Sequence, residues 1–99
     1  MTSYLLGRKI RLTVTITSVA TGAAADPDNL TLTIRNRDTS INTAYVYGTD
    51  AEIVKSATGI YYCDITPAAD GNYSYRWSCT GTITDAVEDQ YSIEPSEVV

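Results

Sequence analysis

The sequence contains no histidine and no phenylalanine, and it has only two cysteines among its 99 residues. Histidine is the commonest general base in enzymes and the commonest metal ligand, so its absence removes the residue on which most catalytic sites depend. The serines, threonines and cysteines therefore have no histidine to activate them as nucleophiles. No glycine-rich phosphate-binding loop is present either. We expect no enzyme, no catalytic residue, and no bound cofactor or metal.

Positive charge is also scarce, since seven basic residues face twelve acidic ones and the net charge is −5. Nucleic-acid-binding domains usually carry a basic patch, so this balance argues against a nucleic-acid partner. No apolar run approaches the roughly 18 residues of a membrane span. The short apolar run Tyr4–Leu6 precedes the basic residues, which is the reverse of a signal peptide. We expect a chain made in the cytoplasm that binds neither nucleic acid nor membrane.

The segment Gly71–Thr80 (GNYSYRWSCT) has the clearest pattern in the chain and contains its single tryptophan. Polar and apolar residues alternate strictly, as in a half-buried β-strand, with Tyr73, Tyr75, Trp77 and Cys79 on one face. Each such ring buries roughly 150–250 Å², more than any other side chain offers. We therefore predict that this segment is a central strand against which the other strands pack.

Six further segments show the same two-residue period or a shorter form of it. They cover residues 9–18, 29–37, 43–47, 51–55, 60–66 and 86–95. The side chains expected to face inward are Ile10, Leu12, Val14, Ile16, Leu30, Leu32, Ile34, Tyr61, Cys63, Ile65, Val87, Tyr91 and Ile93. Asp89 falls on the apolar side of its segment and suggests a β-bulge or the start of the strand. Segment 51–55 is the weakest pattern and is expected at an edge.

Seven short strands, with turns roughly every 8–12 residues and no helical period, predict an all-β fold. We interpret it as an immunoglobulin-like β-sandwich of about seven antiparallel strands, with a small barrel as the alternative. Tyr73, two residues after Gly71, stands where a tyrosine corner would begin the sixth strand. The tryptophan lies on the sixth strand instead of the third, so an antibody-type domain is not expected. The expected organisation is an N-terminal arm (1–8), the sandwich (9–96) and a tail (97–99).

Cys63 and Cys79 allow two interpretations. Two buried free thiols are the expectation. If the segments around 60–65 and 72–79 pair as a hairpin, Cys63 lies opposite a position near Ser74, far from Cys79. If the two segments lie in different sheets, a disulfide becomes possible, and the sequence does not give the distance.

Asp26 and Asp28, with Asn29, offer oxygen ligands of the kind that calcium prefers. The ligand spacing of an EF-hand loop is absent, so a polar turn capped by its own side chains is the expectation. Tyr45, Tyr47, Tyr62 and Tyr91 form either an exposed aromatic patch for a protein or glycan, or part of the core. Core placement is the expectation for any one of them.

The candidate interaction residues near the N-terminus are Tyr4, Leu5, Leu6, Arg8, Lys9 and Arg11. The first three are unusually apolar for a loose arm, so we expect the arm to follow a sheet edge, to dock on a neighbouring subunit, or to pack on its own domain. The last three form the only basic cluster. It is either a contact for an acidic neighbour or a solvated strand face.

Several motifs occur in an order found in one group of proteins: the strand Lys9–Ser18, Ala25-Asp26-Pro27 leading into Leu30–Ile34, Ser56–Tyr61, Gly71–Trp77 followed by Thr80-Gly81-Thr82, and Pro95-Ser96. Over residues 9–96 the chain resembles short immunoglobulin-like proteins encoded among the virion genes of tailed bacteriophages and prophages. The resemblance implies a virion structural protein in many copies, either a capsid decoration or cement subunit or a head–tail joint subunit. Its partners would be the major capsid or head–tail proteins. The alternative is an immunoglobulin-like binding module on a tail or fibre that contacts the bacterial surface.

Overall fold

The computed structural model describes residues 2–67, 69–81 and 83–95, which form eight strands. The strands are β1 (Thr2–Leu5), β2 (Ile10–Thr15), β3 (Asn29–Asn36), β4 (Ile41–Val46), β5 (Ile53–Ala57), β6 (Ile60–Ile65), β7 (Gly71–Thr80) and β8 (Asp85–Glu94). Seven of them lie close to the segments predicted from the two-residue period, and β1 is additional. No helix that could span a membrane occurs among these residues.

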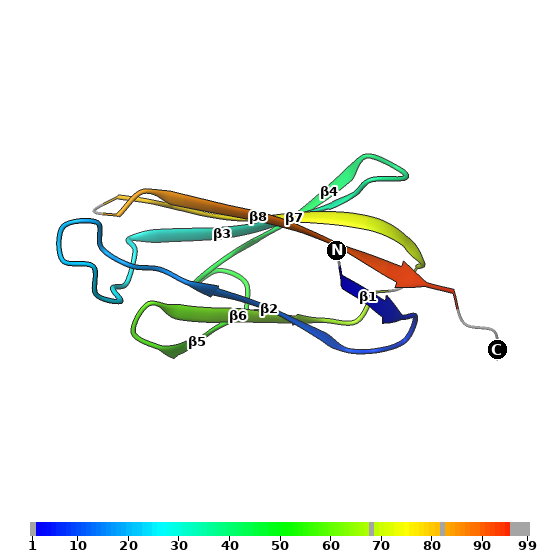
Figure 1. The fold of residues 1–99 in the computed structure, drawn as a ribbon, viewed down its shortest axis with the longest axis horizontal. Coiled ribbons are helices and arrows are strands. Elements are labelled where there is room, and N and C mark those ends of the chain that lie inside the picture. The colour runs from blue at the N-terminus through cyan, green and yellow to red at the C-terminus, as the bar shows by residue number, and fades with distance from the viewer. Residues whose placement is uncertain (1, 68, 82, 96–99) are drawn as a thin grey trace.

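The strands form two sheets, which we call sheet A, with the order β1-β8-β7-β3-β4, and sheet B, with the order β2-β6-β5. All pairings are antiparallel except that of β1 with β8, which is parallel. Figure 1 shows β8, β7, β3 and β4 as one layer and β2, β6 and β5 as the other. A closed barrel would need a ladder between the sheets, and the described residues contain none. The chain is thus all-β with two sheets, an arrangement compatible with a β-sandwich.

The core lies between the two sheets and contains residues from both. Its buried members are Ile10, Leu12, Val14, Ile16, Leu30, Leu32, Ile34, Ile53, Tyr61, Cys63, Trp77, Cys79, Ile83, Tyr91 and Ile93. β7 lies between β8 and β3, as expected of the central strand, and its Trp77 is only 1% exposed. Most of these residues were predicted to face inward from alternation. Full burial of a large apolar side chain stabilises the fold by about 1.5–3 kcal/mol.

The structure decides two points about register that the sequence left open. The segments containing Cys63 and Cys79 do not form a hairpin, because β6 belongs to sheet B and β7 to sheet A. Asp89 does not mark a bulge, since the β7–β8 register is continuous and places it opposite Tyr75. Val87, expected to face the core, is 44% exposed. The first half of β8 has exposed side chains on both faces. The alternating pattern there therefore does not correspond to a buried face.

The N-terminal segment is a strand and not a loose arm. β1 pairs with β8 in the register Thr2↔Tyr91 to Leu5↔Glu94, and the next residue, Leu6, donates its N–H to the Glu94 carbonyl at 2.9 Å. Alternation along β1 directs Tyr4 toward the core, where its ring meets the edge of Tyr91 at a centroid distance of 6.3 Å. The segment therefore follows a sheet edge and packs on its own domain, two of the placements considered for it.

A tyrosine corner is present at the start of β7. The Tyr73 hydroxyl donates to the carbonyl oxygen of Ala69 at 2.8 Å, which ties the strand to the turn before it. The ring of Tyr73 also stacks on Tyr91, with an interplanar angle of 8°. This hydrogen bond confirms the interpretation of the Gly71-Asn72-Tyr73 motif.

Candidate interaction surfaces

The outer face of sheet A carries an open groove of about 520 Å³. It is lined by Thr33, Arg35, Asn42, Ser74, Tyr75, Arg76, Glu88, Asp89 and Gln90. Alternation explains the polar floor: β3 and β7 send their apolar residues inward, so the residues between them point outward. Among residues 2–67, 69–81 and 83–95, no strand lies over this face in the two-layer arrangement of Figure 1.

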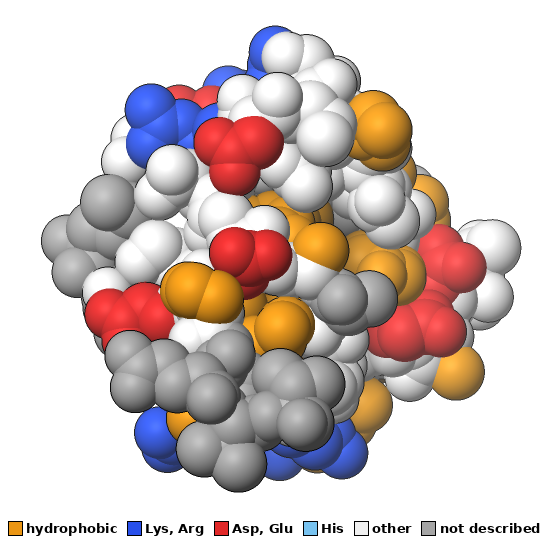
Figure 2. Space-filling model, turned by 90° about the vertical axis from the view of Figure 1, so that its right-hand side faces the viewer, with side chains coloured by type: hydrophobic (Ala, Val, Ile, Leu, Met, Phe, Trp, Pro, Cys, Tyr) orange, Lys and Arg blue, Asp and Glu red, His pale blue; other side chains and the backbone are white. Residues whose placement is uncertain are grey.

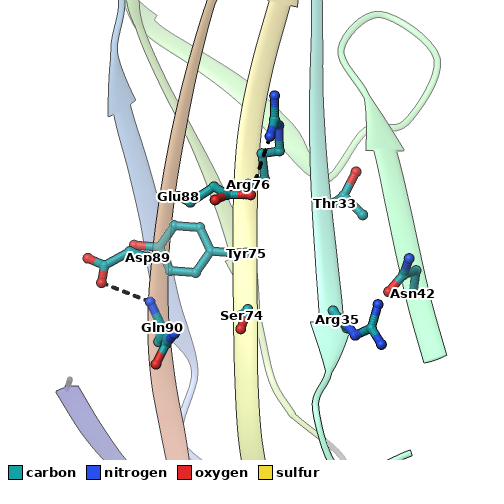
Figure 3. Close-up of a pocket in the computed structure, with 9 residues that line it drawn as sticks. All are labelled: Thr33, Arg35, Asn42, Ser74, Tyr75, Arg76, Glu88, Asp89 and Gln90. Atoms are coloured by element: carbon teal, nitrogen blue, oxygen red, sulfur yellow. Dashed lines mark hydrogen bonds and ion pairs between the residues drawn. The ribbon is translucent and has the colours of Figure 1, made fainter. Parts of the chain in front are cut away.

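Cross-strand pairing arranges the lining residues in two rows. One row contains Asn42, Arg35, Ser74 and Gln90, which are neighbours across β4, β3, β7 and β8. The other contains Ala44, Thr33, Arg76 and Glu88 across the same four strands. In each row one of the two middle residues has a short side chain, Ser74 in the first and Thr33 in the second, and the longer side chains beside them border the hollow. Figure 3 shows the long side chains of β3, β7 and β8 around this floor.

The groove has charges of both signs and weak internal pairing. Arg76 Nη1 lies 3.4 Å from Glu88 Oε1, and both side chains are more than half exposed. Exposed pairs of this kind contribute little, because water screens them and ordering long side chains costs entropy. Arg37 donates to Gln90 Oε1 at 3.1 Å, whereas Arg35 makes no ion pair among the described residues. The surface can thus form charged and hydrogen-bonded contacts with a partner.

The groove has no nucleophile with an activating base. The hydroxyl groups on this outer face belong to Thr33 and Ser74, and neither has a hydrogen bond to a carboxylate or lysine among the described residues. The ring of Tyr75 packs against the core on the inward face of β7. The cysteines lie elsewhere: Cys63 and Cys79 are buried and unpaired in the structure. Burial raises the pKa of the Cys63 thiol to about 11, so that the reactive thiolate is scarce near neutral pH.

Asp26, considered above as a calcium ligand, holds other parts of the chain together. Its carboxylate accepts hydrogen bonds from Lys55 Nζ at 2.6 Å, from the Gly59 N–H at 2.9 Å and from the Tyr61 hydroxyl at 3.0 Å. We expected Asp26 to cap its own turn. Its carboxylate instead caps the β5–β6 turn, which is distant in the sequence. No acidic or cysteine cluster suited to a metal occurs among the described residues.

Gly59 is the residue that the β5–β6 turn requires. Its φ of +74° lies in the left-handed region, and a Cβ there would lie 2.5 Å from the Ile16 carbonyl oxygen. The Ile16 N–H donates to the Gly59 carbonyl at 2.7 Å. Glycine thus lets this turn approach β2 closely, where Asp26 fixes it.

The structure divides the candidate interaction residues of the N-terminus into two groups. Tyr4 and Leu6 pack against the core, and Leu5 is 54% exposed. Arg8 and Lys9 are exposed in the turn that follows β1, with the Arg8 guanidinium 5.9 Å from the centre of the Tyr4 ring.

Arg11 has a different set of direct partners from Arg8 and Lys9. It lies on β2 and forms two hydrogen bonds to the Asp64 carboxylate, at 2.8 and 3.0 Å. Its guanidinium also covers the Tyr62 ring at 3.9 Å. Arg11 already has an acidic partner within its own sheet. Arg11, and to a lesser extent Lys9, lowers the pKa of Asp64, so these two cations share one acidic neighbour.

The four tyrosines considered as an aromatic patch are not on one face. Tyr91 is buried, Tyr45 packs partly against the core, and Tyr62 lies under Arg11 on the outer face of sheet B. Tyr47 is exposed but its ring contacts Tyr61 edge-on, with centroids 5.0 Å apart. The core interpretation holds for Tyr91, and a platform of all four is wrong.

A second group of exposed side chains is apolar, and the sequence had pointed to Leu5 and Tyr47 among them as candidates for contacts. Its members are Leu5, Val19, Ile41, Val46, Tyr47, Val54 and Val87. Figure 2 views the end of the molecule where β1 and the end of β8 lie, and it shows hydrophobic side chains exposed between acidic ones. Alternation gives the face on which a side chain lies, but coverage by another strand decides whether it is buried.

No protein-family model and no curated protein matches this chain.

Proposed function

We propose that the chain is a non-enzymatic structural protein of a tailed-phage virion, an immunoglobulin-like subunit that decorates or cements the capsid or belongs to the head–tail joint. It acts through contacts with the major capsid or head–tail proteins, in many copies per particle. The observation that carries the proposal is the outer face of sheet A, which has an open polar groove with charges of both signs. The resemblance of residues 9–96 to virion proteins supplies the context.

The strand order supports the immunoglobulin-like part of this proposal. Immunoglobulin domains place strands C, F and G in one sheet and strands B, E and D in the other. Assigning β2, β3, β5, β6, β7 and β8 to B, C, D, E, F and G reproduces both sets of neighbours. β4 then corresponds to C′ beside C, as in variable-type domains. The hydrogen bond from Tyr73 to Ala69 falls at the start of F, where a tyrosine corner belongs.

Contacts by the outer face of sheet A suit a subunit that is present many times. A partner that contacts Arg35, Arg76, Glu88 and Gln90 meets both signs of charge, which favours one orientation over others. Each such contact is weak when isolated, but repetition over a particle holds an assembly together through multivalency. A second contact would come from the end of β1 and the connection to β2, where Leu5, Arg8 and Lys9 are exposed.

Quantitative mass spectrometry of purified virions from the phage that encodes the chain tests the proposal. A copy number far above that of the portal protein supports a place on the head shell or along the tail, and tail-less heads then separate the two. A copy number equal to that of the portal supports the joint. Absence of the chain from washed particles overturns the virion proposal.

A second candidate function is a binding module on a tail or fibre that contacts the bacterial surface. The observation that favours it is the same groove, because arginine, asparagine, glutamine and carboxylate groups around a hollow suit the hydroxyl groups of a glycan. A glycan array probed with the purified chain separates the two. Saturable binding that is lost when Arg35 and Arg76 are replaced favours the binding module, and silence over the array counts against it.

A further inference from the structure

We propose that two copies of the chain pair edge to edge through β4, about a two-fold axis, so that their two A sheets become one continuous sheet. The partner surface is thus a second copy of this chain, and the site is the free edge of β4. The inference does not depend on the virion proposal, since it concerns the isolated chain in solution.

β4 is the last strand of sheet A and pairs only with β3. The Tyr47 N–H, just beyond the strand, donates to the Leu30 carbonyl at 3.0 Å. Backbone N–H and C=O groups alternate in direction along an antiparallel strand, so those of the odd-numbered residues of β4 point toward β3. The N–H and C=O groups of Asn42, Ala44 and Val46 therefore point to the open side.

Val46 already has partners for both groups. Its N–H donates to Asp50 Oδ2 at 2.8 Å, and its carbonyl accepts from the N–H groups of Thr49 and Asp50. Asn42 and Ala44 are left with open backbone groups. This fixes the register of a two-fold pair: Asn42 of each copy lies opposite Ala44 of the other, and the axis passes between the two Thr43 residues.

The sequence of β4 lacks the features that protect sheet edges. Edge strands usually carry charges, proline or a bulge, or are very short. β4 reads INTAYV, with no charge and no proline. The other edges are protected: β5 contains Lys55 beside a register shift, β1 has four residues, and β2 contains Arg11. The half of β8 not paired with β1 contains Asp85, Glu88 and Asp89.

The exposed side chains of β4 match one another in this register. Ile41, which is 64% exposed, would lie opposite Tyr45 of the second copy on the inward face of the sheet. Thr43 would face Thr43, and such β-branched pairs are favourable across a ladder. On the outer face, Val46 is 39% exposed and would lie opposite Ser40 of the second copy. Pairing would cover apolar area that each copy alone leaves in water.

The charges at the two ends of β4 favour an antiparallel pair with a second copy. Arg35, Arg37 and Asp38 lie beside the beginning of β4, where two positive charges and one negative give +1, and the acidic Asp50 and Glu52 follow its end. A two-fold axis brings the acidic end of one copy to the basic end of the other. A parallel pair would bring like ends together. An interface that is the same patch on both copies also closes after two subunits, so it gives a dimer and not a fibre.

The test is a charge exchange at the two-fold axis. Thr43 is exposed, so Thr43→Lys and Thr43→Glu leave the fold intact while placing like charges opposite each other in a homodimer. Sedimentation equilibrium over a concentration series should give twice the chain mass of 10.7 kDa for the wild type and the single mass for each variant. An equimolar mixture of the two variants should return to twice the mass. Thr13→Lys, on the exposed face of β2, is the matched control and should stay dimeric.

Ala44→Pro gives an independent check on the register. Proline removes the N–H that points to the open side, and no hydrogen bond to β3 is lost with it. This variant should be monomeric, with the circular dichroism spectrum of the wild type. A wild type that is monomeric at every concentration overturns the proposal. Dimers that persist in both charge variants, or assemblies larger than two copies, also overturn it.

Discussion

The carboxylate of Asp26 lies 3.0 Å from the hydroxyl of Tyr61, which links the loop before β3 to the core of sheet B. The same carboxylate binds Lys55 and the N–H of Gly59, so one side chain holds three groups on or next to β5 and β6. This site was considered as a metal ligand from sequence, and in the structure its donors are all supplied by the chain. It also makes stability depend on pH.

Asp26→Asn should lower the melting temperature at neutral pH and reduce its dependence on acid pH. Lys55, followed by Gly59, lowers the pKa of Asp26 from 3.8 to about 2. A pKa that is lower in the folded state stabilises the fold above pH 3.8, and this contribution is lost as pH falls toward 2. Melting curves between pH 7 and pH 2 should therefore show the two proteins converging in acid. A constant difference over that range would contradict the assignment.

Tyr73→Phe should destabilise the fold by about 1 kcal/mol, because it removes the hydrogen bond to Ala69 while keeping the ring that stacks on Tyr91. The matched control is Tyr62→Phe, since the Tyr62 hydroxyl has no hydrogen bond among the described residues and its ring stays under Arg11. Urea unfolding measures both. Equal losses in the two variants would remove the special role of the corner.

Thiol titration should find two free cysteines after unfolding in the absence of reductant, and very slow reaction in the native state. Cys63 and Cys79 are buried on facing sheets, and burial raises the pKa of both thiols. A buried protonated thiol reacts only when the fold opens. Finding no free thiol in the unfolded chain would mean that a disulfide joins sheets A and B.

Ser74→Arg should weaken binding to particles that lack the chain, because it fills the floor of the groove between Arg35 and Gln90. A loss of about tenfold corresponds to about 1.4 kcal/mol. Thr15→Arg adds the same side chain to an exposed position of β2 and serves as the control. Co-sedimentation with the particles measures the affinity, and unchanged melting temperatures would show that both variants are folded. Equal binding by both variants would exclude the groove as the contact.

The exposed cations Arg8 and Lys9 should contribute to the same binding, and Arg11 should not. Replacing Arg8 and Lys9 with glutamate should lower the affinity and flatten its dependence on salt, since exposed charges are screened by ions. Arg11→Gln should leave binding unchanged, because its guanidinium is already held by Asp64. Salt titrations of co-sedimentation distinguish these cases. A loss only with Arg11→Gln would reverse the assignment.

Most strands and inward faces could be predicted because alternation is a local property. β7 was predicted residue for residue, and Tyr61 and Cys63 face the core as predicted. Val87 has the same pattern and is 44% exposed, because its half of β8 is only partly covered by the described residues of the other sheet. The alternating pattern shows which residues share a face of a strand. Whether that face is buried depends on other segments of the chain that pack on it.

The candidate surfaces were the least predictable part. Arg8, Lys9 and Arg11 are close in sequence, yet Arg11 pairs with Asp64 across the β2–β6 ladder. The groove combines residues of β3, β4, β7 and β8, and no segment contains enough of them to give a local signal. The free edge of β4 follows from the strand order alone, which short-range patterns do not contain.

By itself, the sequence determined an all-β chain, its strand segments, most of its core and the lack of histidine-dependent chemistry, because each follows from residue type and two-residue spacing. Tertiary structure alone decided that β6 and β7 lie in different sheets, that β1 closes one edge of sheet A, and that β4 is left open at the other. Strand neighbours depend on contacts between residues distant in sequence. Those contacts are selected by the burial of the whole core, and no single segment encodes them.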